Sequence, residues 1–374
     1  MKADVTSTAP LSGRELVCVL GLPIDMIDLP TAVARVRHAA LTRERCFIST
    51  PNLNFLINAQ RDESFRDSVL RSDLSLADGV SLLAVARLMG VRLPGRVSGA
   101  DLFLELCASK EHPPLRVFFL GGPKGAAKLA CERVNAQPQG VIGVGHHEGG
   151  FGDVESLSNQ ALIDAINETK PDFVVVSFGA QKGQAWIMRN HHRLTAPVIS
   201  HLGAVVNFTA GTVKRAPRWM QTWGLEWLWR ATTEPGLFDR YWKDGRALLS
   251  ILIKEVIFGA ALERRTRRRH RQPANHEELA PLMDGTRRLA ISGYWGRKES
   301  DLLRQTLVLA SGARTAAIEI DASQATWFDP FALGVLAQIH GKLLGEGTFG
   351  LRIVKLNEKV RRQLERNELH YLIG

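Results

Sequence analysis

The chain has 374 residues, of which 45% are hydrophobic and 23% charged, and its formal net charge is +10. This length predicts two domains and a connector rather than a single core, and the composition excludes a disordered chain. The four cysteines are scattered without a CxxC pair. Their spacing argues against a disulfide framework or a zinc site and indicates a reducing compartment.

No segment predicts export or a membrane span. The amino-terminal stretch MKADVTSTAPLSGRE lacks the apolar core of a signal peptide. The longest apolar run, 247–262, is interrupted by Lys254 and Glu255 and is shorter than the roughly 20 residues that cross a bilayer. We therefore expect a cytoplasmic protein.

Residues 16–210 alternate strand patterns with helix patterns across short connections. The strand patterns are rich in Val, Ile and Phe and apolar on both faces, which predicts the α/β class: a Rossmann-like, doubly wound, mostly parallel sheet covered by helices. The expected strands are 16–22, 45–50, 74–77, 116–122, 139–145, 171–179 and 197–203, and the expected helices are 30–44, 53–72, 80–90, 100–111, 124–137, 156–170 and 184–196.

Polar residues stand where two of these strands end. Thr50 and Asn52 lie at the end of the strand 45–50, and Asp78 follows the strand 74–77. The carboxyl ends of parallel strands meet at one edge, where α/β folds bind ligands, so we expect these side chains to face a single pocket. Two structural roles stay open, namely Asn52 as a helix N-cap and Asp78 as part of a turn.

The run FLGGPKG, 119–125, predicts a strand, a glycine turn and a helix start. Gly121 and Gly122 would bring backbone N–H groups and a helix N-terminus toward an anion. The run matches neither the GxGxxG fingerprint nor a P-loop. Tight turning alone explains the two glycines equally well.

Segment 211–272 carries most of the net charge, with fourteen Lys and Arg against six Asp and Glu. Trp219, Trp223 and Trp227 recur every four residues, so a helix presents them on one face. Tryptophans beside arginines, followed by the basic run 264–271, favour an anionic membrane surface as partner. An ordinary packing helix remains an alternative. Nucleic acid is the least favoured partner, because no nucleic-acid-binding motif accompanies the arginines.

Residues 286–374 predict a second, small α/β domain, in which no cluster of catalytic type occurs. We expect a binding or regulatory module, joined by a linker at 272–278, and a fragment ending at Gln272 that folds alone. The expected strands are 287–293, 316–323 and 350–356, and the expected helices are 298–310, 331–344 and 358–372.

Several blocks between Val17 and Tyr241 occur in a fixed order, namely STPNLNFL, ADGVSLL, RVSGADL, VFFLGGPKGAA, PDFVVVSFGA, RAPRW and GLEWLWR. With these blocks the chain resembles the WecG/TagA/CpsF glycosyltransferases, glycosyltransferase family 26. The resemblance implies an inverting enzyme that needs neither metal nor other cofactor. It would move N-acetylmannosamine or a related hexose from a UDP-sugar to a polyprenyl-diphosphate-linked sugar, on the inner face of the membrane, in cell-surface polysaccharide synthesis.

The resemblance also implies roles for single residues. Asp78 falls on the family's proposed general base, with Thr50 and Asn52 at neighbouring active-site positions. The family's Gln-Glu pair is replaced here by Gly183-Gln184, which leaves open a catalytically impaired scaffold that binds a sugar nucleotide. The expected substrate-binding residues come from the RVSGADL block, the glycine turn, the Gly183-Gln184 position and the appendage that starts at 211. They are Arg96, Gly121, Gly122, Gln184, Arg215, Arg230 and Arg240.

The sequence AAIEIDASQATWFDPFALGVL, 316–336, resembles a STAS domain, the sulphate-transporter and anti-sigma-factor-antagonist fold. That resemblance implies a protein partner for the module. The family's phosphorylatable serine is missing, because Asp329 is followed by Pro330 and Phe331. The predicted organisation is a catalytic domain at 1–210, a membrane-associating appendage and basic linker at 211–272, and a STAS-like domain at 273–374.

Overall fold

The computed structural model describes residues 14–149, 152–217, 220, 228–229, 274–279, 285–310, 317–348 and 350–374. Several predicted features therefore lie outside the described residues. They are the tryptophan face, the basic run, and the two appendage arginines Arg230 and Arg240.

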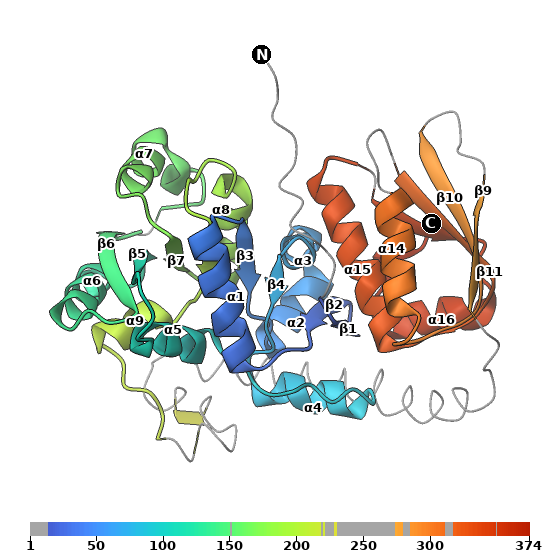
Figure 1. Ribbon diagram of the computed structural model, residues 1–374, viewed down its shortest axis with the longest axis horizontal. Coiled ribbons are helices and arrows are strands. Elements are labelled where there is room, and N and C mark those ends of the chain that lie inside the picture. Colours follow the sequence, from blue (N-terminus) through green and yellow to red (C-terminus); the bar gives the residue numbers. More distant parts are fainter. Residues whose placement is uncertain are drawn as a thin grey trace.

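A six-stranded sheet forms the centre of the amino-terminal unit (Figure 1). Its strand order is β4-β3-β8-β7-β5-β6, and every pair in it is parallel, which confirms the predicted parallel α/β architecture. The strands are β3 (Cys46–Ser49), β4 (Leu74–Ser75), β5 (Leu115–Gly121), β6 (Val141–His147), β7 (Phe173–Ser177) and β8 (Val198–His201).

Successive strand residues enter different cores, which is why the strands are apolar on both faces. Val117 and Phe119 belong to the core that faces α1, α5, α6 and α9, whereas Phe118 and Leu120 belong to the core that faces α7 and α8. The helices are α1 (Leu29–Thr42), α2 (Leu53–Arg61), α3 (Glu63–Leu70), α4 (Val80–Leu88), α5 (Gly99–Ala108), α6 (Ala126–Ala136), α7 (Gln160–Glu168), α8 (Ala180–Asn190) and α9 (Val205–Ala210).

Two expectations for the amino-terminal unit were wrong. The run 16–22 does not join the parallel sheet. It forms an antiparallel hairpin of β1 (Leu16–Val19) and β2 (Leu22–Asp25), turned by two residues of positive φ. The expected helix 53–72 is two helices, because Asp62 ends α2 and caps α3 by accepting a hydrogen bond from the Phe65 N–H at 3.1 Å.

The carboxyl-terminal unit is a four-stranded sheet of order β12-β11-β10-β9, with β9 antiparallel to β10 and the other pairs parallel. The predicted linker at 272–278 was wrong in part, because Asn275–Leu279 forms β9. The other elements were predicted and are β10 (Thr286–Trp295), α14 (Ser300–Ala310), β11 (Ala317–Phe328), α15 (Pro330–Gly345), β12 (Leu351–Val354) and α16 (Glu358–Arg366).

Helix α15 lies between the two units (Figure 1). Cys18 of β1 and Leu70 of α3 belong to the apolar core of the carboxyl-terminal unit. The Tyr371 hydroxyl donates a hydrogen bond to the Gly21 carbonyl at 2.7 Å. A fragment ending at Gln272 would therefore expose apolar residues that the complete chain buries, which argues against the expectation that it folds alone. The boundaries at 210 and 272 stay predictions.

Close approach of backbones makes this contact tight. A Cβ atom on Gly334 would lie 2.9 Å from the Val17 carbonyl carbon, and one on Gly341 would lie 2.3 Å from the Leu70 carbonyl oxygen. Only glycine fits α15 at these two positions without displacing main chain.

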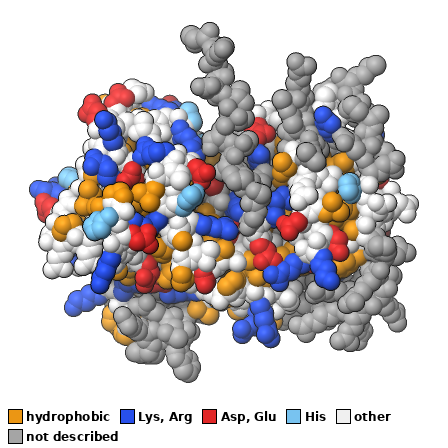
Figure 2. Space-filling model, in the orientation of Figure 1, with side chains coloured by type: hydrophobic (Ala, Val, Ile, Leu, Met, Phe, Trp, Pro, Cys, Tyr) orange, Lys and Arg blue, Asp and Glu red, His pale blue; other side chains and the backbone are white. Residues whose placement is uncertain are grey.

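None of the described helices is long and apolar enough to cross a membrane. On the face shown in Figure 2, Lys and Arg side chains are interspersed with Asp and Glu over both units. The charge excess of segment 211–272 falls mostly on residues outside the described ranges, so the membrane-surface prediction stays a prediction.

Candidate functional site

The carboxyl edge of the six-stranded sheet brings the loops after β3 and β4 together. The Asp78 N–H donates to the Pro51 carbonyl at 2.8 Å, and the Leu76 N–H donates to the Ser49 carbonyl at 2.9 Å. The two loops are therefore fixed against each other by main-chain hydrogen bonds. This arrangement is what the ends of adjacent parallel strands predict.

Asn52 and the Asp78-Gly79 turn lie side by side at this edge. Gly79 has a φ of +111°, and a Cβ atom on it would lie 3.7 Å from the Asn52 Cβ. Asn52 caps α2, because its side chain accepts a hydrogen bond from the Phe55 N–H at 3.2 Å. The N-cap role that the sequence left open is thus real, and it orients Asn52 at the same edge as Asp78.

Thr50 is nearly enclosed, with 5% of its surface exposed. The start of α5 covers it, because a Cβ atom on Gly99 would lie 3.5 Å from the Thr50 methyl carbon and 2.6 Å from a methyl carbon of Leu202. Thr50 therefore shares the edge with Asn52 and Asp78 but presents little surface to a ligand.

Asp101 on α5 gathers two of the predicted arginines. Its Oδ2 accepts hydrogen bonds from Arg96 at 2.7 Å and from the Ser98 hydroxyl at 2.6 Å, and its Oδ1 accepts one from Arg215 at 2.9 Å. Burial disfavours the charged carboxylate, but the Ser98 hydrogen bond and the charges of Arg215 and Arg96 outweigh it and hold the pKa of Asp101 below its ordinary value.

This cluster adjoins Asp78. The Val97 N–H, next to Arg96, donates to the carbonyl of Ala77, next to Asp78, at 2.8 Å. The segment after α9 thereby reaches the edge through Arg215. Asp101 and Ser98 were missed as site residues, although both belong to the RVSGADL block, in which serine followed three residues later by aspartate is a helix-capping pattern.

The glycine turn after β5 packs against the end of β7. Gly121 has a φ of +94°, and a Cβ atom on it would lie 2.6 Å from the Phe178 ring. The Gly122 N–H donates to the Ser177 carbonyl at 2.8 Å. Close packing therefore requires these glycines, and their role in anion binding stays a prediction.

A carboxylate already lies at the start of α6. Glu148 Oε1 accepts a hydrogen bond from the Gly125 N–H at 2.7 Å. The chains that leave β5 and β7 run to opposite sides of the sheet, since β5 is followed by β6 and β7 by β8 in the order β8-β7-β5-β6. Such a switch point is where doubly wound folds open a crevice for a ligand.

The Gly183-Gln184 departure has a structural counterpart in His201. A Cβ atom on Gly183 would lie 2.2 Å from His201 Cδ2, so the imidazole fills the space beside this glycine. Gln184 is fully enclosed and donates a hydrogen bond to the Ser49 hydroxyl at 3.1 Å. The structure therefore does not bring Gln184 to the surface of the site, and its predicted substrate contact stays untested.

Within the part of the chain that the structure describes, no group of three or more His, Cys, Asp or Glu side chains is arranged to hold a metal ion. Arg96 and Arg215 bring two guanidinium groups to this edge. A carboxylate at a strand end beside arginines is an arrangement suited to group transfer from an anionic donor.

Comparison with known proteins agrees with an enzyme that transfers a group. The family model described as "Glycosyl transferase WecG/TagA/CpsF family" matches residues 17–261, and the chain belongs to that family. It is therefore a hexosyltransferase. The match ends before β9, so the carboxyl-terminal unit lies outside it.

Three relatives carry the name N-acetylglucosaminyldiphosphoundecaprenol N-acetyl-beta-D-mannosaminyltransferase. The protein of Bacillus spizizenii strain W23 is 27% identical over 235 residues, which cover 62% of this chain and 90% of the relative. That of Bacillus subtilis strain 168 is 28% identical over 208 residues, covering 56% and 79%. That of Staphylococcus aureus strain NCTC 8325 is 24% identical over 222 residues, covering 59% and 85%.

Proposed function

We propose that this chain transfers N-acetylmannosamine or a related hexose from a UDP-sugar to a polyprenyl-diphosphate-linked sugar, in the synthesis of a cell-surface polysaccharide. The named relatives act on N-acetylglucosaminyldiphosphoundecaprenol, which supports the acceptor class. The observation that carries the proposal is the meeting of the Asn52 and Asp78 loops with the Arg96, Asp101 and Arg215 cluster at one sheet edge.

In the proposed reaction Asp78 is the general base. It takes the proton from an acceptor hydroxyl while that oxygen forms a bond to the anomeric carbon and the bond from this carbon to the UDP oxygen breaks. A single displacement of this kind inverts the anomeric configuration. Arg96 and Arg215 stabilise the negative charge that develops on the departing diphosphate, while Asp101 fixes their positions. We propose that these arginines take the place of a divalent metal ion.

The remaining parts of the proposal concern the membrane and the carboxyl-terminal unit. The acceptor is a lipid, so we propose that segment 211–272 attaches the enzyme to an anionic membrane on its inner face. We also propose a STAS-like module at 273–374 that binds a protein partner. The alternation of parallel strands β10, β11 and β12 with α14, α15 and α16 supports this assignment.

The direct test supplies the full-length protein with UDP-N-acetylmannosamine and N-acetylglucosaminyldiphosphoundecaprenol in EDTA. We expect release of UDP in step with a lipid-linked disaccharide whose new bond is β-configured if the donor is α-linked. Binding of the UDP-sugar without product would support the scaffold alternative that the Gly183-Gln184 departure motivates. Activity that disappears in EDTA and returns with a divalent ion would contradict the arginine assignment.

A further inference from the structure

Strand β4 carries the loop of Asp78 and is the shortest strand of the six-stranded sheet. It stands at the end of the strand order beside β3. The Leu76 N–H, directly after β4, donates to the Ser49 carbonyl of β3 at 2.9 Å. The Ser75 N–H, by contrast, donates to Oδ2 of Asp25, the last residue of β2, at 2.7 Å. A carboxylate therefore holds the main chain of this short edge strand.

Asp25 is itself fixed by guanidinium groups. Its side chain has no exposed surface. Arg14 donates to both of its oxygens, from Nε to Oδ1 at 3.0 Å and from Nη2 to Oδ2 at 2.7 Å, and Arg35 donates to Oδ1 at 3.5 Å. A bidentate pair of this kind is geometrically specific, whereas an enclosed ion pair need not be more stable than apolar packing. What the pair supplies here is a fixed position for the Ser75 main chain.

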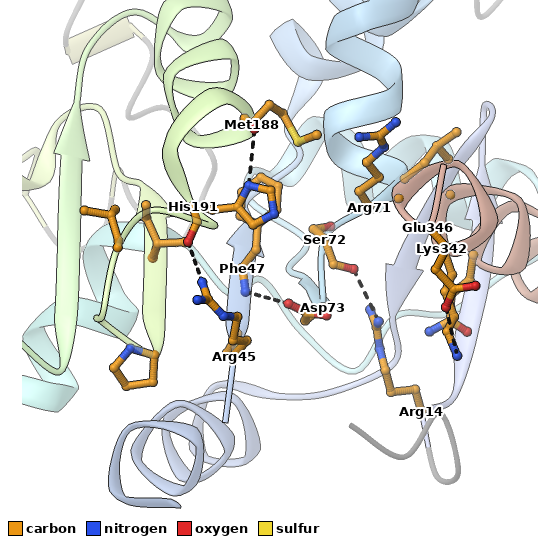
Figure 3. Close-up of a pocket in the computed structure, with 18 of the residues that line it drawn as sticks. Arg14, Arg45, Phe47, Arg71, Ser72, Asp73, Met188, His191, Lys342 and Glu346 are labelled. Atoms are coloured by element: carbon orange, nitrogen blue, oxygen red, sulfur yellow. Dashed lines mark hydrogen bonds and ion pairs between the residues drawn. The ribbon is translucent and has the colours of Figure 1, made fainter. Parts of the chain in front are cut away.

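Arg14 also holds the chain that enters β4. Its Nη1 donates to the Ser72 carbonyl at 3.4 Å (Figure 3). The next residue, Asp73, exchanges two hydrogen bonds of 2.8 Å with the Phe47 main chain, one through its N–H and one through its carboxylate. Arg14 and Asp25 together therefore hold β4 at both of its ends.

The carboxyl-terminal unit reaches this network through one buried side chain. Arg304 of α14 is 5% exposed and donates a hydrogen bond to the Arg14 carbonyl. A second contact between the units lies one residue further along, where Arg297 pairs with Glu15. These two side chains are 60% and 41% exposed. The Arg304 contact thus involves the residue that holds Asp25, whereas the Arg297 contact lies at the surface beside it.

We propose that Asp25 is a positioning residue for Asp78, and that the carboxyl-terminal unit supports it through Arg304 and Arg14. The inference rests on the proposed role of Asp78 as general base. Asp78 follows Ser75 by three residues, so a displacement of β4 moves the Asp78 carboxylate. A general base acts only within hydrogen-bond reach of the proton that it takes, and a small misplacement lowers turnover strongly.

The test measures kcat by UDP release, the Kd of the UDP-sugar and the melting temperature of full-length variants. Asp25→Asn should lower kcat by about 10- to 100-fold, and Arg304→Met by about threefold to tenfold. Both should leave the UDP-sugar Kd unchanged. Both should also lower the melting temperature, so kcat is measured well below it. The matched control is Arg297→Met, which removes the surface contact between the units and should leave kcat unchanged.

A double-mutant cycle separates positioning from stability. In an Asp25→Asn background, Arg304→Met should lower kcat no further, because both act through Arg14. Should Asp25→Asn fail to fold, the comparison of Arg304→Met with Arg297→Met decides alone. Wild-type kcat in folded Arg304→Met, or effects on kcat that multiply independently in the double variant, would overturn the inference.

Hydrogen exchange separates this inference from the proposed function, because it needs no substrate. The amides at 76–79 should exchange faster in Asp25→Asn and Arg304→Met than in the wild type, and at the wild-type rate in Arg297→Met. A wild type that releases no UDP would contradict the proposed function. Unchanged exchange at 76–79 in both network variants overturns the inference whether or not the wild type is active.

Discussion

The two edges of the six-stranded sheet use the same short strands for different purposes. At the carboxyl edge, the loops that follow β3 and β4 carry Thr50 and Asp78 and are joined by the hydrogen bond from the Asp78 N–H to the Pro51 carbonyl. At the amino edge, Phe47 in β3 and Asp73, which directly precedes β4, are joined by two hydrogen bonds and line a cavity beside α15. The candidate site and the contact with α15 therefore lie at the two ends of one pair of strands.

The two edges lie close together because the strands are short. Phe47 and Thr50 are three residues apart, which is about 10 Å of extended chain. The carboxyl edge collects polar loops and guanidinium groups, whereas the amino edge is held by main-chain contact at Gly341 and by apolar packing. Substitutions at the carboxyl edge should therefore change chemistry at constant stability, and those at the amino edge should change stability first.

The largest expected effect is that of Asp78→Asn. The amide has nearly the shape of the carboxylate but cannot take up a proton, so we expect turnover to fall by about 100- to 10,000-fold while the melting temperature and UDP-sugar affinity stay near those of the wild type. UDP release under single-turnover conditions measures the loss. A folded variant with wild-type turnover would remove Asp78 from the mechanism and would break the contrast between the edges.

Gly341→Ala tests the amino edge. The new Cβ would lie 2.3 Å from the Leu70 carbonyl oxygen, which is main chain and cannot rotate away, so we expect a loss of about 2–3 kcal/mol of unfolding free energy. Chemical denaturation measures it. Gly345→Ala, four residues on in the same helix, is the matched control, because nothing lies within 4 Å of its Cβ. Equal stability of the two variants would show that α15 does not approach the Leu70 main chain this closely.

The fold was predictable where a pattern is local. Val117, Phe118, Phe119 and Leu120 are all apolar because each strand faces helices on both sides, and this run alone indicates a buried parallel strand. The hairpin of β1 and β2 was missed because its turn uses Leu20 at a φ of +46°, a conformation that leucine rarely adopts. Strand β9 was missed because NHEEL is polar and gains its place only by pairing with β10.

The site residues were likewise predictable only where a local pattern identifies them. Asn52 and Asp78 were expected together because strand ends share an edge, whereas the role of Asp101 depends on Arg215, 114 residues away. Gln184 was assigned by its place in a motif, and only the packing against Ser49 shows that it is enclosed. Pairings between distant segments are set by the tertiary structure, which no local pattern contains.

A third test uses the pH dependence of the carboxyl-terminal unit. His340 of α15 is buried and contacts the Leu351 main chain, and burial, together with the charges of Arg66 and Arg352, lowers its pKa to about 4. The unfolded chain takes up this proton below about pH 6.5 and the folded chain only near pH 4, so stability present at neutral pH is lost as the pH falls between these values.

At pH 5 this difference amounts to about 2 kcal/mol. Denaturation of the wild type and of His340→Leu between pH 7 and 4 measures it, and subtracting the two curves removes the contribution of the carboxylates. We expect the wild type to lose more stability on acidification than the variant does. Parallel curves would show that His340 titrates equally in the folded and unfolded chain and contributes nothing to the pH dependence of stability.

The smallest expected effect tests whether packing at the carboxyl edge also contributes to the stability of the fold. Gly183→Ala places a Cβ 2.2 Å from His201 Cδ2, and we expect it to cost about 1–2 kcal/mol, because the imidazole is held by its hydrogen bond to the Phe178 carbonyl at 2.7 Å. In a His201→Ala background the same substitution should cost almost nothing. The double-mutant cycle then gives a coupling energy close to the cost of the single change. Additive effects would mean that a side chain at position 183 does not meet the His201 imidazole. The imidazole would then not be the group that fills the space beside Gly183.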